Sequence, residues 1–279
     1  MSAQDNLRVP ILAYHASNIS GNVYQLNDHI AFESDLYTLH HAGYTIIPLR
    51  WIAEWLNGER DLEAMSESLG DKLIGLSCDD GLDLDFKNGN YFDFGPQRSF
   101  YNILKSFVED VGQENQPQAN LTSFVIACPE ARKVMDEKSL NSQNLMNHDW
   151  WHEAAQSNLM DIENHGWDHR HPDIYPDTQA NFTSITDQAA AEKQIIQAKH
   201  WIENQITPSQ STQFAYPWGH TNEFLLNEFM PNQAQQAGIQ AAYTCGAQHV
   251  TKTCNSYDIP RYVCGFNWKS PKQLLELIS

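Results

Sequence analysis

The 279-residue chain predicts an α/β fold in which a parallel sheet or barrel alternates with helices. Strand-like apolar runs alternate with runs whose apolar positions recur at helical spacing, which is typical of parallel strands joined by crossover helices. The length is normal for an α/β barrel and allows roughly three quarters of the unfolded surface to be buried. No internal repeat or low-complexity linker divides the sequence, so residues 1–279 are expected to form a single domain.

Short apolar runs bounded by turn residues define the predicted strands. These are 9–15, 45–49, 73–78, 121–128, 160–163, 214–216, 241–244 and 257–263. Apolar positions three or four residues apart define the predicted helices. These are 30–42, 49–57, 100–111, 150–158, 186–205, 223–237 and 271–278. Residues 83–120 are the least regular stretch, and we interpret them as an irregular insertion that either shapes access to the end of strand 73–78 or only decorates the surface.

Residues 78–81 read Cys-Asp-Asp-Gly and end the strand predicted at 73–78. Two adjacent carboxylates at a buried strand end repel each other and lose hydration, so a metal ion or a shared proton must offset the cost. Successive strand side chains point to opposite faces, so Asp79 and Asp80 are expected to start in different directions and to hold different roles. The alternative is an ordinary turn with solvated acids, since Asp-Gly is a common turn dipeptide.

A histidine pair gives a second signal, because His165 and His169 lie four residues apart. On a helical turn this spacing puts both imidazoles on one face, at a separation that a divalent metal can bridge. With one carboxylate they make a two-histidine, one-carboxylate set with open positions, which is typical of catalytic metal sites. The alternative is a histidine-rich surface loop, since Gly166 and Pro172 suit a loop and the chain has 12 histidines.

Three segments resemble the motifs of the polysaccharide deacetylases, carbohydrate esterase family 4 with its NodB homology domain. Residues 78–81 resemble the family's Thr-Phe-Asp-Asp-Gly motif, 165–169 resemble His-[Ser/Thr]-x-x-His, and 214–219 are similar to Phe-Arg-Pro-Pro-Tyr-Gly. The similarity extends from about residue 9 to residue 261, and its start resembles the branch that includes the biofilm poly-N-acetylglucosamine deacetylases. The resemblance implies a deformed (β/α) barrel of seven strands and a metal-dependent hydrolase that deacetylates an N-acetylated sugar or polysaccharide.

The sequence departs from the family pattern at the steering arginine and at the general acid. Ala215 stands where most members have an arginine that steers the catalytic aspartate, and Gly166 replaces the usual serine or threonine. No Leu-x-His follows Gly219, although many members take their general acid from such a motif. Residues 12–15 (Leu-Ala-Tyr-His) supply a Leu-x-x-His variant, and a closed barrel brings its first and last strands together. His15 is therefore the general-acid candidate; the alternative is a strand-end histidine with a satisfied hydrogen bond.

The resemblance assigns the remaining roles to residues of the three motifs. It implies that Asp80, His165 and His169 hold a divalent cation, most simply zinc, although iron, cobalt or nickel also suit these ligands. Asp79, left free of the metal, is the candidate general base that takes the proton of the attacking water. The oxyanion is expected to lie against the backbone N–H of Trp218.

Arg261, near the end of a late strand, is the candidate substitute for the missing arginine. A guanidinium can clamp a carboxylate through two parallel hydrogen bonds and keep it ionised. The alternative is that Arg261 pairs with a surface acid.

A protonated His15 beside a cation also needs a carboxylate on its other ring nitrogen, and Asp258 is one candidate.

Two other functions stay open beside sugar deacetylation: hydrolysis of a small non-sugar amide or imide, and carbohydrate binding without catalysis. Ala215 favours the first, and the intact aspartate and histidine motifs argue against the second. Aromatic side chains in or beside the motifs offer faces for stacking on sugar rings, or simply pack in the core. These are Tyr14, Trp167, Tyr216 and Trp218.

Charge and composition limit the partners. The 17 basic and 35 acidic residues give a net charge of −18, which argues against nucleic acid and anionic membrane surfaces. Residues 1–6 show no basic segment leading into an apolar one, so we expect no secretory signal and a cytoplasmic location. No apolar run reaches the roughly 18 residues that span a bilayer. The five cysteines contain no Cys-x-x-Cys pair and are expected to be reduced thiols.

Overall fold

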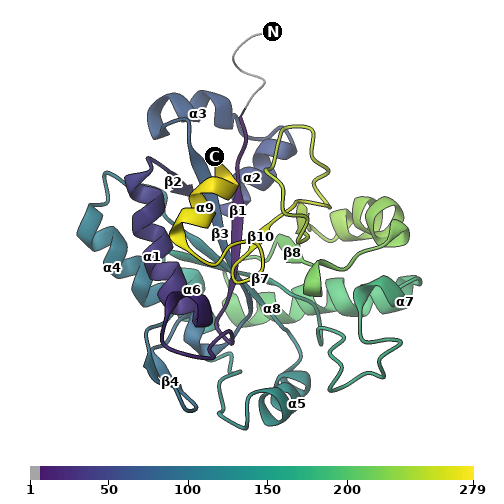
Figure 1. Cartoon of the computed structure of the whole chain (residues 1–279). Coiled ribbons are helices and arrows are strands. Elements are labelled where there is room, and N and C mark those ends of the chain that lie inside the picture. Colours follow the sequence, from purple (N-terminus) through teal and green to yellow (C-terminus); the bar gives the residue numbers. More distant parts are fainter. Residues whose placement is uncertain (1–6) are drawn as a thin grey trace.

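A parallel sheet that closes toward a deformed barrel forms the centre of the fold (Figure 1). The structure is a computed structural model that describes residues 7–279. Residues 1–6, on which the expectation about a secretory signal rests, lie outside the described residues. Seven strands follow the order β10-β1-β3-β6-β7-β8-β9, and β2 pairs with β3 beside them. The predicted α/β fold with a seven-stranded (β/α) barrel is thus confirmed.

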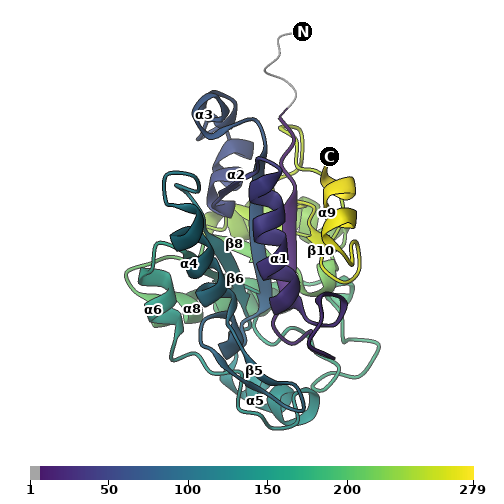
Figure 2. The same ribbon diagram turned by 60° about the vertical axis from the view of Figure 1, so that its left-hand side comes forward.

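All strands of this sheet overlap runs that the sequence predicts. They are β1 (Ile11–His15), β2 (Thr45–Ile47), β3 (Leu73–Asp80), β6 (Leu121–Val125), β7 (Met160–Asn164), β8 (Gln213–Ala215), β9 (Ala241–Tyr243) and β10 (Tyr262–Val263). The helices lie outside the sheet, as Figure 2 shows for α1, α4 and α9. The α-helices are α1 (Asp28–His41), α2 (Leu49–Leu56), α3 (Leu62–Leu69), α4 (Phe100–Val111), α5 (Pro129–Ser139), α6 (Trp151–Gln156), α7 (Gln188–Ala191), α8 (Ala198–Ile206) and α9 (Pro271–Ile278).

The chain between β9 and β10 brings the two ends of the sheet together. Ile259 forms a parallel bridge with Tyr243 of β9, and its N–H donates to Ala242 O at 2.9 Å. Three residues later β10 begins, and it pairs with β1 in parallel register. The first strand of the chain therefore lies beside the last one, as the closed-barrel argument for His15 requires.

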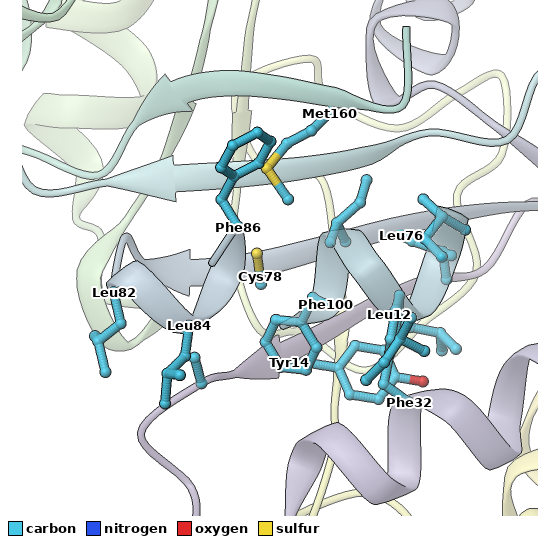
Figure 3. Packing of buried hydrophobic residues seen from close by; sticks show 14 of the residues in the cluster. Leu12, Tyr14, Phe32, Leu76, Cys78, Leu82, Leu84, Phe86, Phe100 and Met160 are labelled. Atoms are coloured by element: carbon cyan, nitrogen blue, oxygen red, sulfur yellow. The ribbon is translucent and has the colours of Figure 1, made fainter. Parts of the chain in front are cut away.

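The pleat of β1 and β3 sorts their side chains into an outer layer that faces the helices and an inner layer that faces the barrel. Tyr14 and Cys78 are register partners and pack in the outer cluster with Phe32 of α1 (Figure 3). The Tyr14 and Phe32 rings meet edge to face with centroids 5.0 Å apart. Burying an apolar side chain such as Phe32 stabilises the fold by about 1.5–3 kcal/mol. His15 and Asp79, the next register pair, therefore point to the opposite side, into the barrel.

The segment 83–120 leaves the carboxyl end of β3 and returns to β6. It contains η3 (Asp83–Asp85), the hairpin strands β4 (Gly89–Tyr91) and β5 (Gly95–Gln97), and α4. The helix predicted at 100–111 is confirmed, whereas the hairpin has no counterpart in the sequence prediction. Asn22 Nδ2 donates to Phe94 O at 3.0 Å, so the hairpin lies against the loop that follows β1.

Within residues 7–279, the helices are all too short or too polar to cross a membrane.

The turn after β3 gives a first prediction, because Gly81 has a φ of +73° and a Cβ there would lie 2.8 Å from Val125 Cβ. Gly81→Ala should lower the free energy of unfolding by about 2–4 kcal/mol, since left-handed strain and overpacking add together. Gly95→Ala is the matched control: its φ is also +73°, but among the described residues nothing lies within 4 Å of the added Cβ. Urea titration of both variants measures the difference, and equal losses would contradict the steric argument.

Candidate active site and metal centre

The two adjacent carboxylates lie at the carboxyl end of β3, where the backbone leaves the extended conformation. Asp80 has a φ of +80° and Gly81 a φ of +73°, so strand alternation alone does not place the Asp80 side chain. Asp79 Oδ2 lies 3.9 Å and Asp80 Oδ1 lies 3.8 Å from the same atom, His165 Nε2. The expectation that the pleat sends the two acids in different directions is therefore wrong at Asp80, because the left-handed turn brings both carboxylates to one imidazole.

His165 and His169 come from the loop after β7, and the helical turn predicted there is wrong. Residues 165–170 form no helix, and φ is +90° at Gly166, +59° at His169 and +47° at Arg170. These left-handed residues turn the loop back, so that the two imidazole rings meet with centroids 4.9 Å apart. The spacing of four residues thus brings the imidazoles together through a loop rather than through a helical face.

Asp80, His165 and His169 converge, since one ligand atom of each lies within 4.8 Å of the other two. His169 Nε2 lies 3.5 Å from Asp80 Oδ1. His165 Nδ1 lies 2.8 Å from Ala215 O, and an N–H donated to that carbonyl leaves Nε2 as the nitrogen that faces the carboxylates. Two imidazoles, one of them held in a fixed tautomer, and one carboxylate are a set of donors that fits a divalent metal ion.

Burial controls the charge of the two histidines. It lowers the pKa of His165, and it takes the pKa of His169 well below its usual value. Both rings are consequently neutral near pH 7, which is the form in which imidazole binds a metal ion. The Asp80 side chain is 19% exposed, so the cluster has contact with solvent on that side.

Arg261, the residue before β10, pairs with Asp79 inside the barrel. Nη1 donates to Oδ1 at 2.7 Å and Nη2 to Oδ2 at 2.8 Å, which is a two-pronged ion pair. Burial alone would raise the pKa of Asp79, but attraction to Arg261 and His165 holds the pKa below its usual value. The Asp79 carboxylate is therefore ionised and fixed in orientation. The alternative contact of Arg261 with a surface acid is absent among the described residues.

Ala215 contributes its backbone rather than its side chain. Its carbonyl contacts His165, and its methyl group lies in the apolar cluster that contains Phe124. The Arg261 guanidinium lies 5.3 Å from the centre of the Phe124 ring. Arg261, which comes from the β10 end of the sheet, thus lies against an aromatic ring of the apolar cluster that also contains Ala215.

His15 points into the barrel as the register partner of Asp79, and its side chain is half-buried. Its ring Nδ1 has no hydrogen-bond partner among residues 7–279. Asp28 Oδ2 accepts the backbone N–H of His15 at 2.9 Å, and Asp258 Oδ1 accepts from Thr244 Oγ1 at 2.9 Å. The expectation that a carboxylate, with Asp258 as candidate, holds the ring nitrogen is therefore wrong in this structure.

Trp218 is the aromatic motif residue that reaches the surface beside the cluster. It lies in the turn η6 (Pro217–Gly219) with a φ of +54°, and the residue is 42% exposed. Its ring centroid is 4.2 Å from that of His169, in an edge-to-face arrangement. Tyr14 and Tyr216 are fully buried and Trp167 is half-buried, so packing is the better interpretation of these three.

Sequence reasoning missed the polar side chains that support these groups. Ser77 Oγ lies 3.1 Å from Arg261 Nη1, and the buried side chains of Asp168 and Gln194 contact each other behind the histidine loop. Only Asp168 carries a signal in the sequence, because it lies within the four-residue histidine spacing. Ser77 sits in an apolar run and Gln194 in a long helix, where neither differs from an ordinary residue.

The sequence model of the family described as polysaccharide deacetylase matches residues 113–242. This span contains the histidine loop and the segment 214–219. No curated protein sequence matches the chain significantly.

Several solved structures share the fold of the chain at low sequence identity. The Streptococcus pyogenes deacetylase PplD, solved in complex with acetate, is 18% identical with a TM-score of 0.64, and the match covers 98% of both chains. IcaB from Ammonifex degensii is 15% identical with a TM-score of 0.65, again over 98% of both chains. A de-N-acetylase from Aggregatibacter actinomycetemcomitans is 15% identical with a TM-score of 0.60, over 97% of this chain and 99% of that chain. At such identities the likeness shows the fold alone.

The buried ion pair gives a second prediction. Arg261→Met leaves the Asp79 charge buried without its partner, so the free energy of unfolding of the metal-free protein at pH 7 should fall by about 3–5 kcal/mol. Because the pKa of Asp79 is held below its unfolded value of about 3.9, the pair stabilises the fold above that pH and less as the pH falls further. The difference between wild type and variant should therefore shrink in acid.

Urea titrations at several pH values measure this effect, and a double variant supplies the control. Arg261→Met combined with Asp79→Asn removes both charges, so it should lose less stability than Arg261→Met alone. A double variant that is less stable than the single one would show that the charge of Asp79 is not the source of the loss.

Proposed function

We propose that the chain, whose residues 113–242 match the polysaccharide deacetylase family model, is a metal-dependent hydrolase that removes acetyl groups from an N-acetylated sugar. The observation that carries the proposal is the convergence of Asp80, His165 and His169 next to the ionised pair of Asp79 and Arg261. The family match supports a deacetylase, and the structurally similar deacetylase from Streptococcus pyogenes was solved with acetate, the product of such a reaction.

The three converging side chains would hold the metal, with zinc as the simplest assignment and iron, cobalt or nickel as alternatives. When bound, a divalent cation polarises the amide carbonyl and makes an attacking water more acidic. The neutral imidazoles and the exposed edge of Asp80 suit this role, because a catalytic metal site keeps positions open to solvent and substrate.

Asp79 would act as the general base. Arg261 occupies both of its carboxylate oxygens from one side and keeps the group charged, and the carboxylate faces the imidazole of His165. In this arrangement Asp79 accepts the proton of the attacking water without binding the metal itself. The backbone N–H of Trp218 is the candidate donor to the oxygen on which negative charge develops.

His15 would act as the general acid that protonates the departing amine. It lies beside Asp79 across the β1–β3 pair, so base and acid come from neighbouring strands. Its Nδ1 is buried without a hydrogen-bond partner among the described residues, so Nε2 is the ring nitrogen left to exchange the proton. The roles of Asp79, Arg261, Trp218 and His15 rest on this geometry and on the motif resemblance.

The direct test measures metal and product together. We expect the purified wild-type protein, loaded with Zn²⁺ or Co²⁺, to hold close to one ion per chain and to release acetate from N-acetylglucosamine oligomers. His169→Gln should lose both, whereas His41→Gln, which changes an exposed histidine on α1, should lose neither. A wild-type protein that binds no metal, or that binds metal but releases acetate from no N-acetylated sugar, would contradict the proposal.

Asp79→Asn separates the base from the metal ligands. The amide cannot accept the water's proton, so turnover should fall by roughly 10²-fold or more while the metal content stays at the wild-type level. Acetate release and metal analysis on the same preparation measure both quantities. Near-wild-type turnover would show that another group is the base.

His15→Ala tests the general acid through the leaving group. Turnover of ordinary amides should fall by roughly 10²-fold or more, whereas activated amides, whose leaving groups need no proton, should suffer much less. Metal content should not change, because His15 is not among the three converging ligands. An equal loss on both kinds of substrate would instead place His15 in binding or folding.

A further inference from the structure

The helix behind the histidine loop contains a wide turn in its middle. Residues 188–206 form one helix in which α7 and α8 are joined by the π-helical segment η5 (Glu192–Gln197). Among residues 7–279 there is a second such segment, η7 (Leu225–Ala234), and that one contains Pro231. The segment η5 contains no proline or glycine, so no residue within it disfavours the ordinary α-helix. We therefore expect the wide turn of η5 to be caused by the contacts that the segment makes with neighbouring residues.

Two buried polar contacts connect η5 to the histidine loop. Gln194 Nε2 donates to Asp168 Oδ1 at 2.7 Å, and both side chains are buried. The Asp168 backbone N–H donates back to Gln194 Oε1 at 3.4 Å. At the next residue of η5, Ile195 O accepts from Asn164 Nδ2 at 2.8 Å, and Asn164 Oδ1 accepts the Gly166 N–H at 2.8 Å. The segment therefore contacts the loop immediately before His165 and immediately before His169.

Asp168 also supports a part of the histidine loop that has an unfavourable backbone conformation. His169 and Arg170 have φ values of +59° and +47°, which residues with a Cβ rarely adopt and which need support from their surroundings. Asp168 Oδ1 accepts the Arg170 N–H at 3.0 Å, and Asp168 Oδ2 accepts the Tyr175 hydroxyl at 2.7 Å. Lys193 Nζ lies 3.6 Å from the same Oδ2. The Asp168 carboxylate thus has partners on the loop and on η5.

Gly166 lies beside the Phe182 ring and the amide of Gln194. A Cβ at this position would lie 3.3 Å from Phe182 Cζ and 3.5 Å from Gln194 Oε1. With a φ of +90°, the position also suits glycine on conformational grounds. The left-handed backbone and the close Phe182 ring therefore favour glycine at this position.

We infer that η5 is a positioning device for the metal ligands, in which Gln194 and Asn164 are positioning residues that set the loop of His165 and His169 before a metal arrives. This inference rests on the proposed metal site. The wide π turn directs the Gln194 side chain to Asp168 and the Ile195 carbonyl to Asn164 at the same time. Outer contacts of this kind commonly change metal affinity by roughly 10–100-fold when they are lost.

Variants of Gln194 test the inference through metal affinity. Gln194→Leu removes both hydrogen bonds, and Gln194→Glu sets a carboxylate against Asp168; each should weaken Zn²⁺ and Co²⁺ binding by roughly 10–100-fold. Asp168→Asn combined with Gln194→Glu reverses donor and acceptor, so the double variant should regain part of the affinity. Competition with a chromophoric chelator measures affinity, and the visible spectrum of bound Co²⁺ reports the ligand geometry.

Gln116→Leu is the matched control. Gln116 is as buried as Gln194 and also makes two short contacts, accepting the Ile46 N–H at 2.9 Å and donating to Tyr44 O at 2.9 Å. Its loss should lower the unfolding temperature without changing metal affinity. Wild-type affinity and an unchanged Co²⁺ spectrum in both Gln194 variants would overturn the inference, as would an equal loss of affinity in Gln116→Leu.

Hydrogen exchange of the wild-type protein tests the same coupling without any variant. Because coupling between two sites is reciprocal, Zn²⁺ should slow amide exchange both in the loop 165–170 and in η5. Protection of the loop alone would overturn the inference. A wild-type protein that binds neither Zn²⁺ nor Co²⁺ would instead refute the proposed metal-dependent function, so the two failures are distinguishable.

Discussion

The Asp79 carboxylate and the Arg261 guanidinium meet inside the barrel through two parallel hydrogen bonds, with 5% and 0% of their side chains exposed. Neither charge could be buried alone, because an unpaired ion in such surroundings loses several kcal/mol of hydration. The pair also depends on the closure of the sheet. Asp79 belongs to β3, whereas Arg261 lies between the bridge at Ile259 and the strand β10, and β1 separates β10 from β3 in the sheet. The candidate site therefore forms only when β1, β3 and β10 have assembled into one sheet.

Parallel strands explain how residues so distant in the sequence come to one place. The carboxyl ends of β1, β3, β7 and β8 lie at one edge of the sheet, and they supply His15, the Asp79–Asp80 pair, His165 and the Ala215 carbonyl. Each strand end contributes one or two groups, and the loops that follow complete the set, as is general for barrels of this kind. The outer faces of the same strands carry only packing, as Tyr14 and Cys78 show.

Patterns with a direct physical cause could be read from the sequence. Apolar period and turn residues predicted the strands and most helices, and the repulsion between two adjacent acids pointed to the end of β3. Features set by tertiary contacts could not be read in this way. The left-handed backbone at Asp80 and His169 has no marker in the sequence, α3 and α5 bury few apolar side chains, and η5 contains no proline or glycine that would mark its wide turn. The sequence alone does not distinguish Gln194 from the other glutamines, because its contact with Asp168 forms only when the helix packs behind the histidine loop.

Charge balance makes the two adjacent acids chemically different, although the left-handed turn brings both to one imidazole. Asp79 has its charge compensated by Arg261, whereas Asp80 has no Lys or Arg within ion-pair distance among the described residues. Its neighbours His165 and His169 have lowered pKa values and are neutral near pH 7, so they offer lone pairs and no positive charge. The uncompensated charge at this strand end is therefore that of Asp80, and a divalent cation is the partner that two neutral imidazoles and one anion can hold together. In the proposed function, the arginine on Asp79 thus distinguishes the base from the metal ligand, although the two consecutive side chains are identical.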